Sequence, residues 1–301
     1  MTTNEQNTLN DQIGKSSYIK CTEGNLRVIT SGETGKAVLL LCGGGLNNAL
    51  LSWKHLIPVL SKHYRVFAID WPKQGKSFPW KGTADHQCLL KCVDIVLEHF
   101  KIETVSLIGL SQGGAITLSY VLSHPERVEK FVVISPAGII RFPVGCHQLL
   151  WLSAKLTWLT NGISRLFFIN RRTAEWSLKK MFPVLPKDFD SIVDDVLEEA
   201  SNNGAGASDW QNNSIGFLKM KVYVTPELHR ISCPALFIQG GKDFAVRPKY
   251  TKEAANKILK AKLVVLENHG HWSNRQSPEI VNTIILDFLN ESVASRAEKT
   301  K

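Results

Sequence analysis

Residues 104–122 have the sequence Thr-Val-Ser-Leu-Ile-Gly-Leu-Ser-Gln-Gly-Gly-Ala-Ile-Thr-Leu-Ser-Tyr-Val-Leu. The apolar run Thr104–Ile108 is typical of a buried strand, and a helical pattern occupies Gln112–Leu122. Between them stands Gly109-Leu110-Ser111-Gln112-Gly113. A serine on a sharp strand-to-helix turn exposes its oxygen at the helix N-terminus, and the crowded positions beside it favour glycine. The stretch therefore predicts an α/β fold in which Ser111 is a nucleophile.

The same alternation of strand and helix patterns extends along the chain. Gly24-Asn25 is a turn signal between two apolar runs, Tyr18–Cys21 and Leu26–Thr30, which predict a β-hairpin. One face of a predicted helix carries Leu89, Cys92, Val93, Val96, Leu97 and Phe100. Six further runs predict strands buried on both faces of a parallel sheet, namely Ala37–Cys42, Arg65–Ile69, Thr104–Ile108, Lys130–Ser135, Ala235–Ile238 and Lys262–Leu266. Strands that alternate with amphipathic helices indicate an α/β layered sheet.

One interval, residues 139–217, lacks strand patterns. It carries helical patterns instead, with apolar residues at Leu149, Leu152, Leu156 and Leu159, and a Gly-, Asn- and Ala-rich stretch near its end. Such an interval between two predicted strands indicates a helical insertion into one α/β domain. We therefore expect a flexible segment at 1–16, a core at 17–138 and 218–292, the insertion at 139–217 and a basic tail at 293–301.

The composition excludes several classes of protein. Of 301 residues, 44% are hydrophobic and 21% are charged, which excludes intrinsic disorder and fibrous architectures. The six cysteines contain no Cys-x-x-Cys pair and suit a reducing compartment better than a disulfide framework. The sequence shows no signal-peptide pattern and no uncharged apolar stretch of about 18 residues. We therefore expect a cytoplasmic protein without stable membrane insertion.

The basic charge does not indicate a nucleic-acid partner. Lysine and arginine number 36 and aspartate and glutamate 27, so the net charge is 36 − 27 = +9. These basic residues are scattered apart from short clusters, and no zinc-finger spacing, RNA-binding strand motif or basic helix before a heptad repeat is present. The charge favours solubility and attracts anionic substrates or surfaces weakly.

Several motifs follow one another in a family-like order. They are Leu41-Cys42-Gly43-Gly44-Gly45, Asp70-Trp71-Pro72-Lys73-Gln74-Gly75-Lys76-Ser77, the serine turn, His124-Pro125-Glu126-Arg127-Val128, Gln239-Gly240-Gly241-Lys242-Asp243 and Gly270-His271-Trp272. With these motifs the chain resembles the α/β-hydrolase superfamily over most of its length. The resemblance implies a mostly parallel eight-stranded sheet flanked by helices, with 139–217 as a helical cap over the serine. A serine nucleophile argues against epoxide hydrolases and haloalkane dehalogenases, which have aspartate there.

A nucleophilic serine needs a base and a carboxylate that orients the base. His271 follows a predicted strand and stands in the family-like Gly-His-Trp setting, with His269 as its competitor. Asp243 follows a late strand and suits the orienting acid. The chain order Ser111, Asp243, His271 is the order this fold uses. Asp70 is expected to brace its own loop.

The developing oxyanion needs preorganised backbone N–H groups. Gln112, which follows the nucleophile, would supply one, and Gly44 the other, with Gly45 as the near alternative. The glycine run is not a phosphate loop, because no Gly-Lys-Ser/Thr sequence closes it. The residues expected around the substrate are Cys42, Gly45, Leu110, Trp151 and Trp272.

These residues predict a serine hydrolase that requires neither a metal nor a cofactor. The expected reaction cleaves a carboxylic ester, thioester or lactone through an acyl-enzyme on Ser111. The substrate would be a small molecule with an apolar acyl or aromatic part, because the insertion is rich in apolar and aromatic residues. Two alternatives stay open: carbon–carbon bond hydrolysis, as in meta-cleavage-product hydrolases, and a ligand sensor that keeps the triad without turnover.

Overall fold

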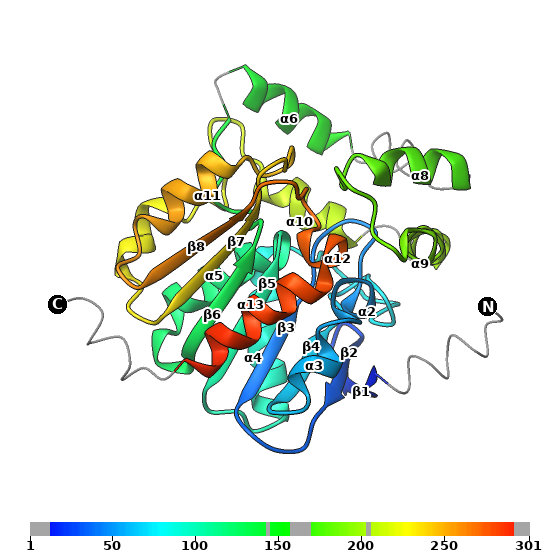
Figure 1. Ribbon diagram of the computed structural model, residues 1–301. Coiled ribbons are helices and arrows are strands. Elements are labelled where there is room, and N and C mark those ends of the chain that lie inside the picture. The colour runs from blue at the N-terminus through cyan, green and yellow to red at the C-terminus, as the bar shows by residue number, and fades with distance from the viewer. Residues whose placement is uncertain (1–12, 143–144, 157–169, 203–205, 292–301) are drawn as a thin grey trace.

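One mixed β-sheet forms the centre of the molecule. The structure is a computed structural model that describes residues 13–142, 145–156, 170–202 and 206–291. The sheet has eight strands in the order β1-β2-β4-β3-β5-β6-β7-β8 (Figure 1). β2 is antiparallel to β1 and β4, and the other neighbours are parallel. The strands are β1 (Lys15–Lys20), β2 (Asn25–Ser31), β3 (Ala37–Leu41), β4 (Arg65–Ile69), β5 (Val105–Leu110), β6 (Val128–Ile134), β7 (Ala235–Gly240) and β8 (Ala261–Leu266).

The predicted mostly parallel sheet is therefore confirmed, with two corrections. β1 begins at Lys15, inside the segment expected to be flexible, because it pairs with β2 from Lys15 opposite Thr30. β8 was expected to be buried on both faces, and this is wrong, since none of its residues is fully buried. β8 is one of the two edge strands of the sheet, so it has a neighbouring strand on one side only.

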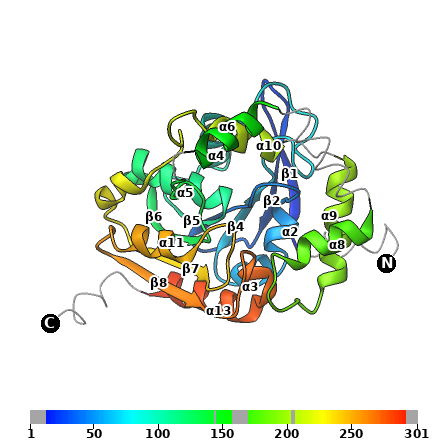
Figure 2. The same cartoon turned by 90° about the horizontal axis from the view of Figure 1, so that it is seen from above.

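Helices cover both faces of the sheet. α3 and α13 lie on one face, and α4 and α5 on the other (Figures 1 and 2). The predicted apolar face of α4 is confirmed, because Leu89, Cys92, Val93, Val96 and Leu97 are buried. The helices outside the chain between β6 and β7 are α2 (Ala49–Trp53), α3 (Ile57–Leu60), α4 (His86–His99), α5 (Gln112–Ser123), α11 (Pro248–Ala255), α12 (Ser273–Gln276) and α13 (Pro278–Asn290), with the 3-10 turn η1 (Pro125–Arg127).

We call the chain between β6 and β7 the β6–β7 connection. Four of its helices, α6 (Cys146–Lys155), α8 (Arg171–Lys179), α9 (Phe189–Asn202) and α10 (Gly206–Ser214), lie beyond the carboxyl ends of the parallel strands (Figure 1). The 3-10 turn η2 (Thr225–Arg230) then precedes β7. The expectations for Leu159, for residues 1–12 and for the tail at 293–301 lie outside the described residues. No helix in the described ranges is long and apolar enough to cross a membrane.

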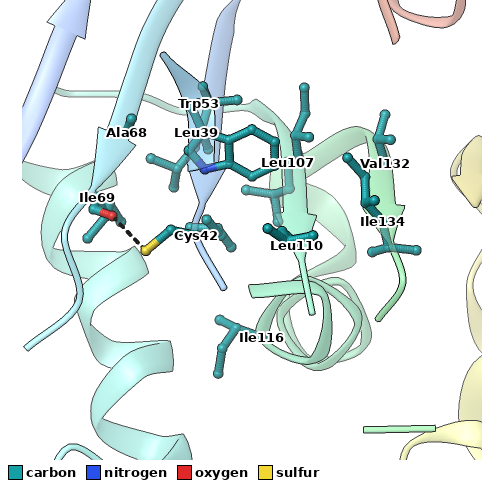
Figure 3. Close-up of a cluster of buried hydrophobic side chains, with 14 of the residues drawn as sticks. Leu39, Cys42, Trp53, Ala68, Ile69, Leu107, Leu110, Ile116, Val132 and Ile134 are labelled. Carbon is teal, nitrogen blue, oxygen red and sulfur yellow. Dashed lines mark hydrogen bonds between the residues drawn. The ribbon is translucent and has the colours of Figure 1, made fainter. Parts of the chain in front are cut away.

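The core consists of apolar side chains on the central strands. Every residue of β3, β5 and β7 is buried. Leu39 of β3 lies beside Leu107 of β5 on one face of the sheet, and Ile108 of β5 lies beside Val132 of β6 on the other. Figure 3 shows buried side chains from these three strands, Leu39, Leu107 and Val132 among them. A central strand covered on both faces needs apolar residues at every position, and so these strands appear as continuous apolar runs in the sequence.

Candidate active site

Ser111 stands at the turn between β5 and α5. Its backbone has φ 49° and ψ −110°, a conformation that costs a residue with a Cβ about 1–3 kcal/mol. The Ser111 N–H donates to the carbonyl of Ile134 at 2.9 Å, and its carbonyl accepts from the N–H groups of Ala115 at 3.1 Å and Ala137 at 2.8 Å. These bonds hold the strained turn, whose geometry is the one the sequence predicts.

The two glycines of the turn are required by space. A Cβ on Gly109 would lie 2.3 Å from the carbonyl oxygen of Gly113. A Cβ on Gly113 would lie 2.1 Å from the carbonyl oxygen of Leu41, the last residue of β3. The start of α5 therefore packs directly on the end of β3, which brings the glycine run at 43–45 next to the serine turn.

Asp243 is a buried carboxylate in the loop after β7. Its Oδ1 accepts hydrogen bonds from the N–H groups of Ala245 at 2.8 Å and Val246 at 2.9 Å. Its Oδ2 accepts from Gln239 Nε2 at 3.1 Å and faces His271 Nδ1 at 2.9 Å. Burial raises the pKa of Asp243, but the interactions with His271 and with the Val246 N–H outweigh it, and the net pKa is below its ordinary value.

The ionisation state of Asp243 determines which ring nitrogen of His271 carries a proton. An ionised carboxylate only accepts hydrogen bonds, so the Nδ1 atom of His271 must carry the hydrogen of the 2.9 Å contact. Neutral imidazole then keeps a lone pair on Nε2, which is the form that a general base requires. His271 is 6% exposed and Asp243 is 4% exposed, so water screens their interaction only weakly.

His269, the competing base, points elsewhere. Its Nε2 lies 2.8 Å from the Ser277 hydroxyl in front of α13. Its backbone carbonyl accepts from the Lys242 N–H at 2.9 Å, which ties the loop after β8 to the loop after β7. The structure therefore joins His271, and not His269, to the carboxylate of Asp243.

Gly44 and Gln112 lie against each other beside the serine turn. A Cβ on Gly44 would be 2.5 Å from Gln112 Oε1. Gln112 is the first residue of α5, so its N–H has no partner within the helix and stands at the positive end of the helix dipole. The two residues expected to hold an oxyanion are thus neighbours.

The comparisons with known proteins agree with this arrangement. The family model of the alpha/beta hydrolase fold matches residues 37–278. The chain belongs to the α/β-hydrolase family. A 2-hydroxy-6-oxononadienedioate/2-hydroxy-6-oxononatrienedioate hydrolase from Cupriavidus pinatubonensis is 26% identical over 282 residues, covering 89% of this chain and 91% of the relative. Carboxylesterase YbfK from Bacillus subtilis is 26% identical over 275 residues, covering 90% and 86%. The crystal structure of that carboxylesterase superimposes with a TM-score of 0.75 at 23% identity, covering 96% of this chain and 98% of that one.

In this α/β-hydrolase, two of the expected pocket residues belong to the core. Cys42 and Leu110 are fully buried. The Cys42 thiol donates to the carbonyl of Ile69 at 3.5 Å and points toward β4 (Figure 3). Burial raises its pKa well above the ordinary value, so Cys42 is a neutral thiol of the core. Cys42 and Leu110, expected around the substrate, are therefore core residues in this structure.

The other three expected pocket residues are less completely buried than Cys42 and Leu110. Gly45 has φ +78° and its carbonyl accepts from Gln74 Nε2 at 2.8 Å. Trp151 lies on α6 and packs edge-on against Phe217, with ring centroids 5.1 Å apart. Trp272 directly follows His271 and packs on Phe182 of the β6–β7 connection at 5.9 Å. Of the three, Trp272 is the one adjacent to the proposed base.

One positioning residue was missed in the sequence. Gln239 Nε2 donates to Asp243 Oδ2, while its Oε1 accepts from the Thr251 hydroxyl at 2.5 Å. Gln239 is the first residue of the motif that contains Asp243, and this position could have indicated that it contacts Asp243.

The β6–β7 connection is joined to the loops of the site by two carboxylates, the buried Glu199 and the partly buried Asp188. Glu199 on α9 accepts from the Gly75 N–H at 2.8 Å and from Asn48 Nδ2 at 3.1 Å. Asp188 pairs with Arg275 Nη2 at 2.6 Å, on the helix that follows His271. Nothing local in the sequence indicates these pairs.

Asp70 braces its loop, as predicted. It is fully buried, pairs with Arg27 Nη1 at 3.0 Å, and accepts from the N–H groups of Ala49 and Lys76, both at 2.8 Å. Among the described residues, no group of three or more His, Cys, Asp or Glu side chains is placed to hold a metal ion.

Proposed function

We propose that this chain is a cofactor-independent serine hydrolase that cleaves a carboxylic ester, thioester or lactone through an acyl-enzyme on Ser111. The observation that carries the proposal is the buried 2.9 Å contact between His271 Nδ1 and Asp243 Oδ2. It orients the ring of His271 at the carboxyl ends of the parallel strands, where the β5–α5 turn presents Ser111.

In the first half-reaction, Ser111 Oγ attacks the carbonyl carbon while His271 Nε2 takes the hydroxyl proton. The negative charge that develops on the carbonyl oxygen is held by the N–H groups of Gln112 and Gly44. His271 then gives its proton to the leaving alcohol or thiol, and the carbon–oxygen or carbon–sulfur bond breaks. Asp243 stabilises the imidazolium throughout and stays ionised.

In the second half-reaction, water replaces the leaving group. His271 Nε2 takes a proton from water as its oxygen attacks the acyl carbon, and the same two N–H groups hold the second oxyanion. Ser111 Oγ leaves with the proton from His271, which releases the carboxylic acid and restores the free enzyme.

Hydrolysis of a carbon–carbon bond is the second candidate, because relatives of both kinds match at 26% identity. The Cupriavidus relative is named for a substrate with two carboxylates, which a protein holds best with unpaired cations. Three cations at or near the loops of this site are already paired: Arg27 with Asp70 at 3.0 Å, Lys73 with Asp209 at 2.5 Å and Arg275 with Asp188 at 2.6 Å. Because these three cations are already paired, they are not free to bind the carboxylates of such a substrate. We therefore favour an ester substrate over the dienedioate.

Parallel kinetics would separate the candidates. We expect p-nitrophenyl esters and an acyl thioester to be turned over with kcat/KM orders of magnitude above that for a meta-cleavage dienoate, and Ser111→Ala to abolish the activity. Turnover of the dienoate alone would contradict ester hydrolysis. A single stoichiometric release of nitrophenol without further turnover would instead identify a ligand sensor.

We expect the reaction to take place in the cytoplasm, which the cysteines support. All six are free thiols, as a reducing compartment would keep them.

We further propose that the helices of residues 139–217 form a cap over the serine. The contacts of Glu199 with Gly75 and Asn48 support this, because they join α9 to loops at the carboxyl edge of the sheet.

A further inference from the structure

The outer side of α6 carries apolar residues where a surface helix normally carries polar ones. Leu149 is 70% exposed and Leu152 is 50% exposed, whereas His147 and Ala154 of the same helix are buried. At about 100° per residue, Leu149 and Leu152 lie within about 60° of each other on the side opposite to His147 and Ala154. The helix therefore has an apolar stripe that faces away from the protein.

A hairpin turn beside α6 adds two more exposed apolar side chains. Phe217 is 52% exposed and Leu218 is 80% exposed. The turn is closed by a bridge between Ile215 and Met220 and by the Gly216 N–H, which donates to the Lys219 carbonyl at 3.0 Å. Two contacts hold it against α6: Gln148 Nε2 donates to the Phe217 carbonyl at 3.1 Å, and the Trp151 and Phe217 rings meet edge-on.

We call the exposed side chains of α6 and of this turn the outer apolar face, namely Leu149, Leu152, Phe217 and Leu218 with the flanking Lys155, Lys219 and Lys221. It lies at the end of the molecule beyond the carboxyl ends of the strands, where α6 is the outermost element (Figure 1). Scattered exposed leucines are ordinary, but a contiguous group of this kind marks an interaction site.

The charged residues that flank the outer apolar face are lysines. No acidic residue stands near Lys155 in the sequence, since none occurs between Glu129 and Glu175, and none occurs between Asp209 and Glu227, which flank Lys219 and Lys221. Lys155 lies over the Trp151 ring at 5.9 Å, which places a cation and an aromatic ring at the rim. Arg141 contributes less, because it pairs with Glu253 at 3.1 Å.

We propose that the outer apolar face docks this protein reversibly on an anionic lipid bilayer. Apolar side chains would enter the interfacial region while the flanking lysines contact lipid phosphates, as in other interfacial helices. A second copy of this chain is a poorer partner, because it would bring its own lysines against these and the like charges would repel. Docking would turn the carboxyl ends of the parallel strands, where Ser111 lies, toward the bilayer.

Co-sedimentation with vesicles tests this directly, using the full chain. We expect binding to mixed phosphatidylcholine–phosphatidylglycerol vesicles at low salt, weaker binding at high salt, and little binding to phosphatidylcholine alone. The combined variant Leu149→Ser, Leu152→Ser, Leu218→Ser should bind at least tenfold more weakly. Its control is Leu259→Ser, because Leu259 is 95% exposed and precedes β8 at the opposite edge of the sheet.

A charge series completes the test. Lys155→Gln, Lys219→Gln, Lys221→Gln should bind at least fivefold more weakly, whereas Lys62→Gln, Lys101→Gln, Lys257→Gln, in turns that precede strands, should bind as wild type does. All variants should melt at the wild-type temperature, since the altered side chains are exposed. Absence of binding to anionic vesicles, or undiminished binding by the leucine variant, would overturn the proposal.

A dimer in sedimentation velocity that the leucine variant abolishes, together with no vesicle binding, would assign the face to a second copy and would also overturn it. None of these results depends on Ser111. A negative result for membrane docking would therefore not contradict the proposed hydrolase activity, and absence of hydrolase activity would not contradict membrane docking.

Discussion

The carboxylate of Asp243 is buried, and it stays ionised because donors surround it on both oxygens. Its contact with His271 selects the ring tautomer that can accept a proton from Ser111. At the residue scale the site therefore holds one strained serine, one imidazole oriented by a carboxylate, and Gly44 beside Gln112.

Replacing Asp243 by asparagine should remove that orientation. The amide of Asp243→Asn offers a donor to Nδ1 and favours the wrong tautomer, so we expect kcat on a nitrophenyl ester to fall about 10⁴-fold with little change in KM. Asp287→Asn, an exposed site on α13, is the matched control and should keep wild-type kcat. A loss of less than tenfold in Asp243→Asn would contradict the role given to this carboxylate.

The stability of the fold should depend on pH through the same residue. The pKa of Asp243 is lower in the folded protein than its ordinary value. Its ionised form therefore stabilises the fold above the unfolded pKa of about 3.9, and this contribution is lost as the pH falls through the folded pKa.

The unfolding free energy of Asp243→Asn should accordingly be about 2 kcal/mol below wild type at pH 7. Urea titrations should show this difference shrinking as the pH falls below about 4. A difference that stays constant down to acid pH would mean that the charge of Asp243 does not contribute to stability.

At the scale of elements, the joint between β3, β5 and α5 positions the serine. It depends on close backbone packing, because a Cβ on Gly113 would collide with the Leu41 carbonyl.

We expect Gly113→Ala to lower the unfolding free energy by about 2–3 kcal/mol and to reduce kcat by shifting the serine turn. Gly82→Ala is the control, since nothing lies within 4 Å of its Cβ position although its φ is +81°. It should cost only the backbone strain of about 1–2 kcal/mol and leave kcat unchanged. An unchanged kcat in Gly113→Ala would contradict the claim that the packing of α5 on β3 positions Ser111.

The β6–β7 connection is coupled to the base through an ion pair of low exposure. Asp188 pairs with the fully buried Arg275 and lies 3.3 Å from Lys54 Nζ. Burial raises the pKa of Asp188, but His55, Arg275 and Lys54 outweigh it and hold this pKa well below its ordinary value. A Cβ on Gly270, next to His271, would lie 2.1 Å from the Met181 carbonyl, so the same segment also packs on the loop of the base.

Breaking this ion pair should therefore destabilise the fold. We expect Asp188→Asn to lower the unfolding free energy by about 2 kcal/mol, less than for a fully buried pair because the Asp188 side chain is 28% exposed. Asp190→Asn is the matched control, since the Asp190 side chain is 87% exposed and pairs with Arg171 on the surface; it should change stability by less than about 1 kcal/mol. Equal effects of the two variants in urea denaturation would argue against a structural role for the Asp188–Arg275 pair.

At the scale of the whole molecule, the sequence predicts what repeats locally and misses what folding brings together. The strands and the serine turn could be predicted because apolar runs and glycines leave a local pattern. Asp243 and His271 are 28 residues apart, yet each follows a strand, and parallel strands end at one edge. By contrast, Asp188 and Arg275 are 87 residues apart with no pattern between them.

Cys42 shows why side-chain direction was harder to predict. Its partner Ile69 lies 27 residues further along the chain, and only the pairing of β3 with β4 turns the thiol toward the core. The net charge of +9 is similarly uninformative as a sum. Its distribution matters more, since the lysines that flank the outer apolar face, Lys155, Lys219 and Lys221, lie in stretches of sequence without acidic residues.

The most direct test of the central claim is covalent labelling with a fluorophosphonate, read by intact mass and peptide mapping. We predict that the wild-type chain takes up one label, on Ser111, that Ser111→Ala takes up none, and that the neighbouring control Ser123→Ala on α5 is labelled like wild type. A wild-type chain that stays unlabelled, or a Ser111→Ala chain labelled to the same extent as wild type, would contradict the assignment of Ser111 as the nucleophile.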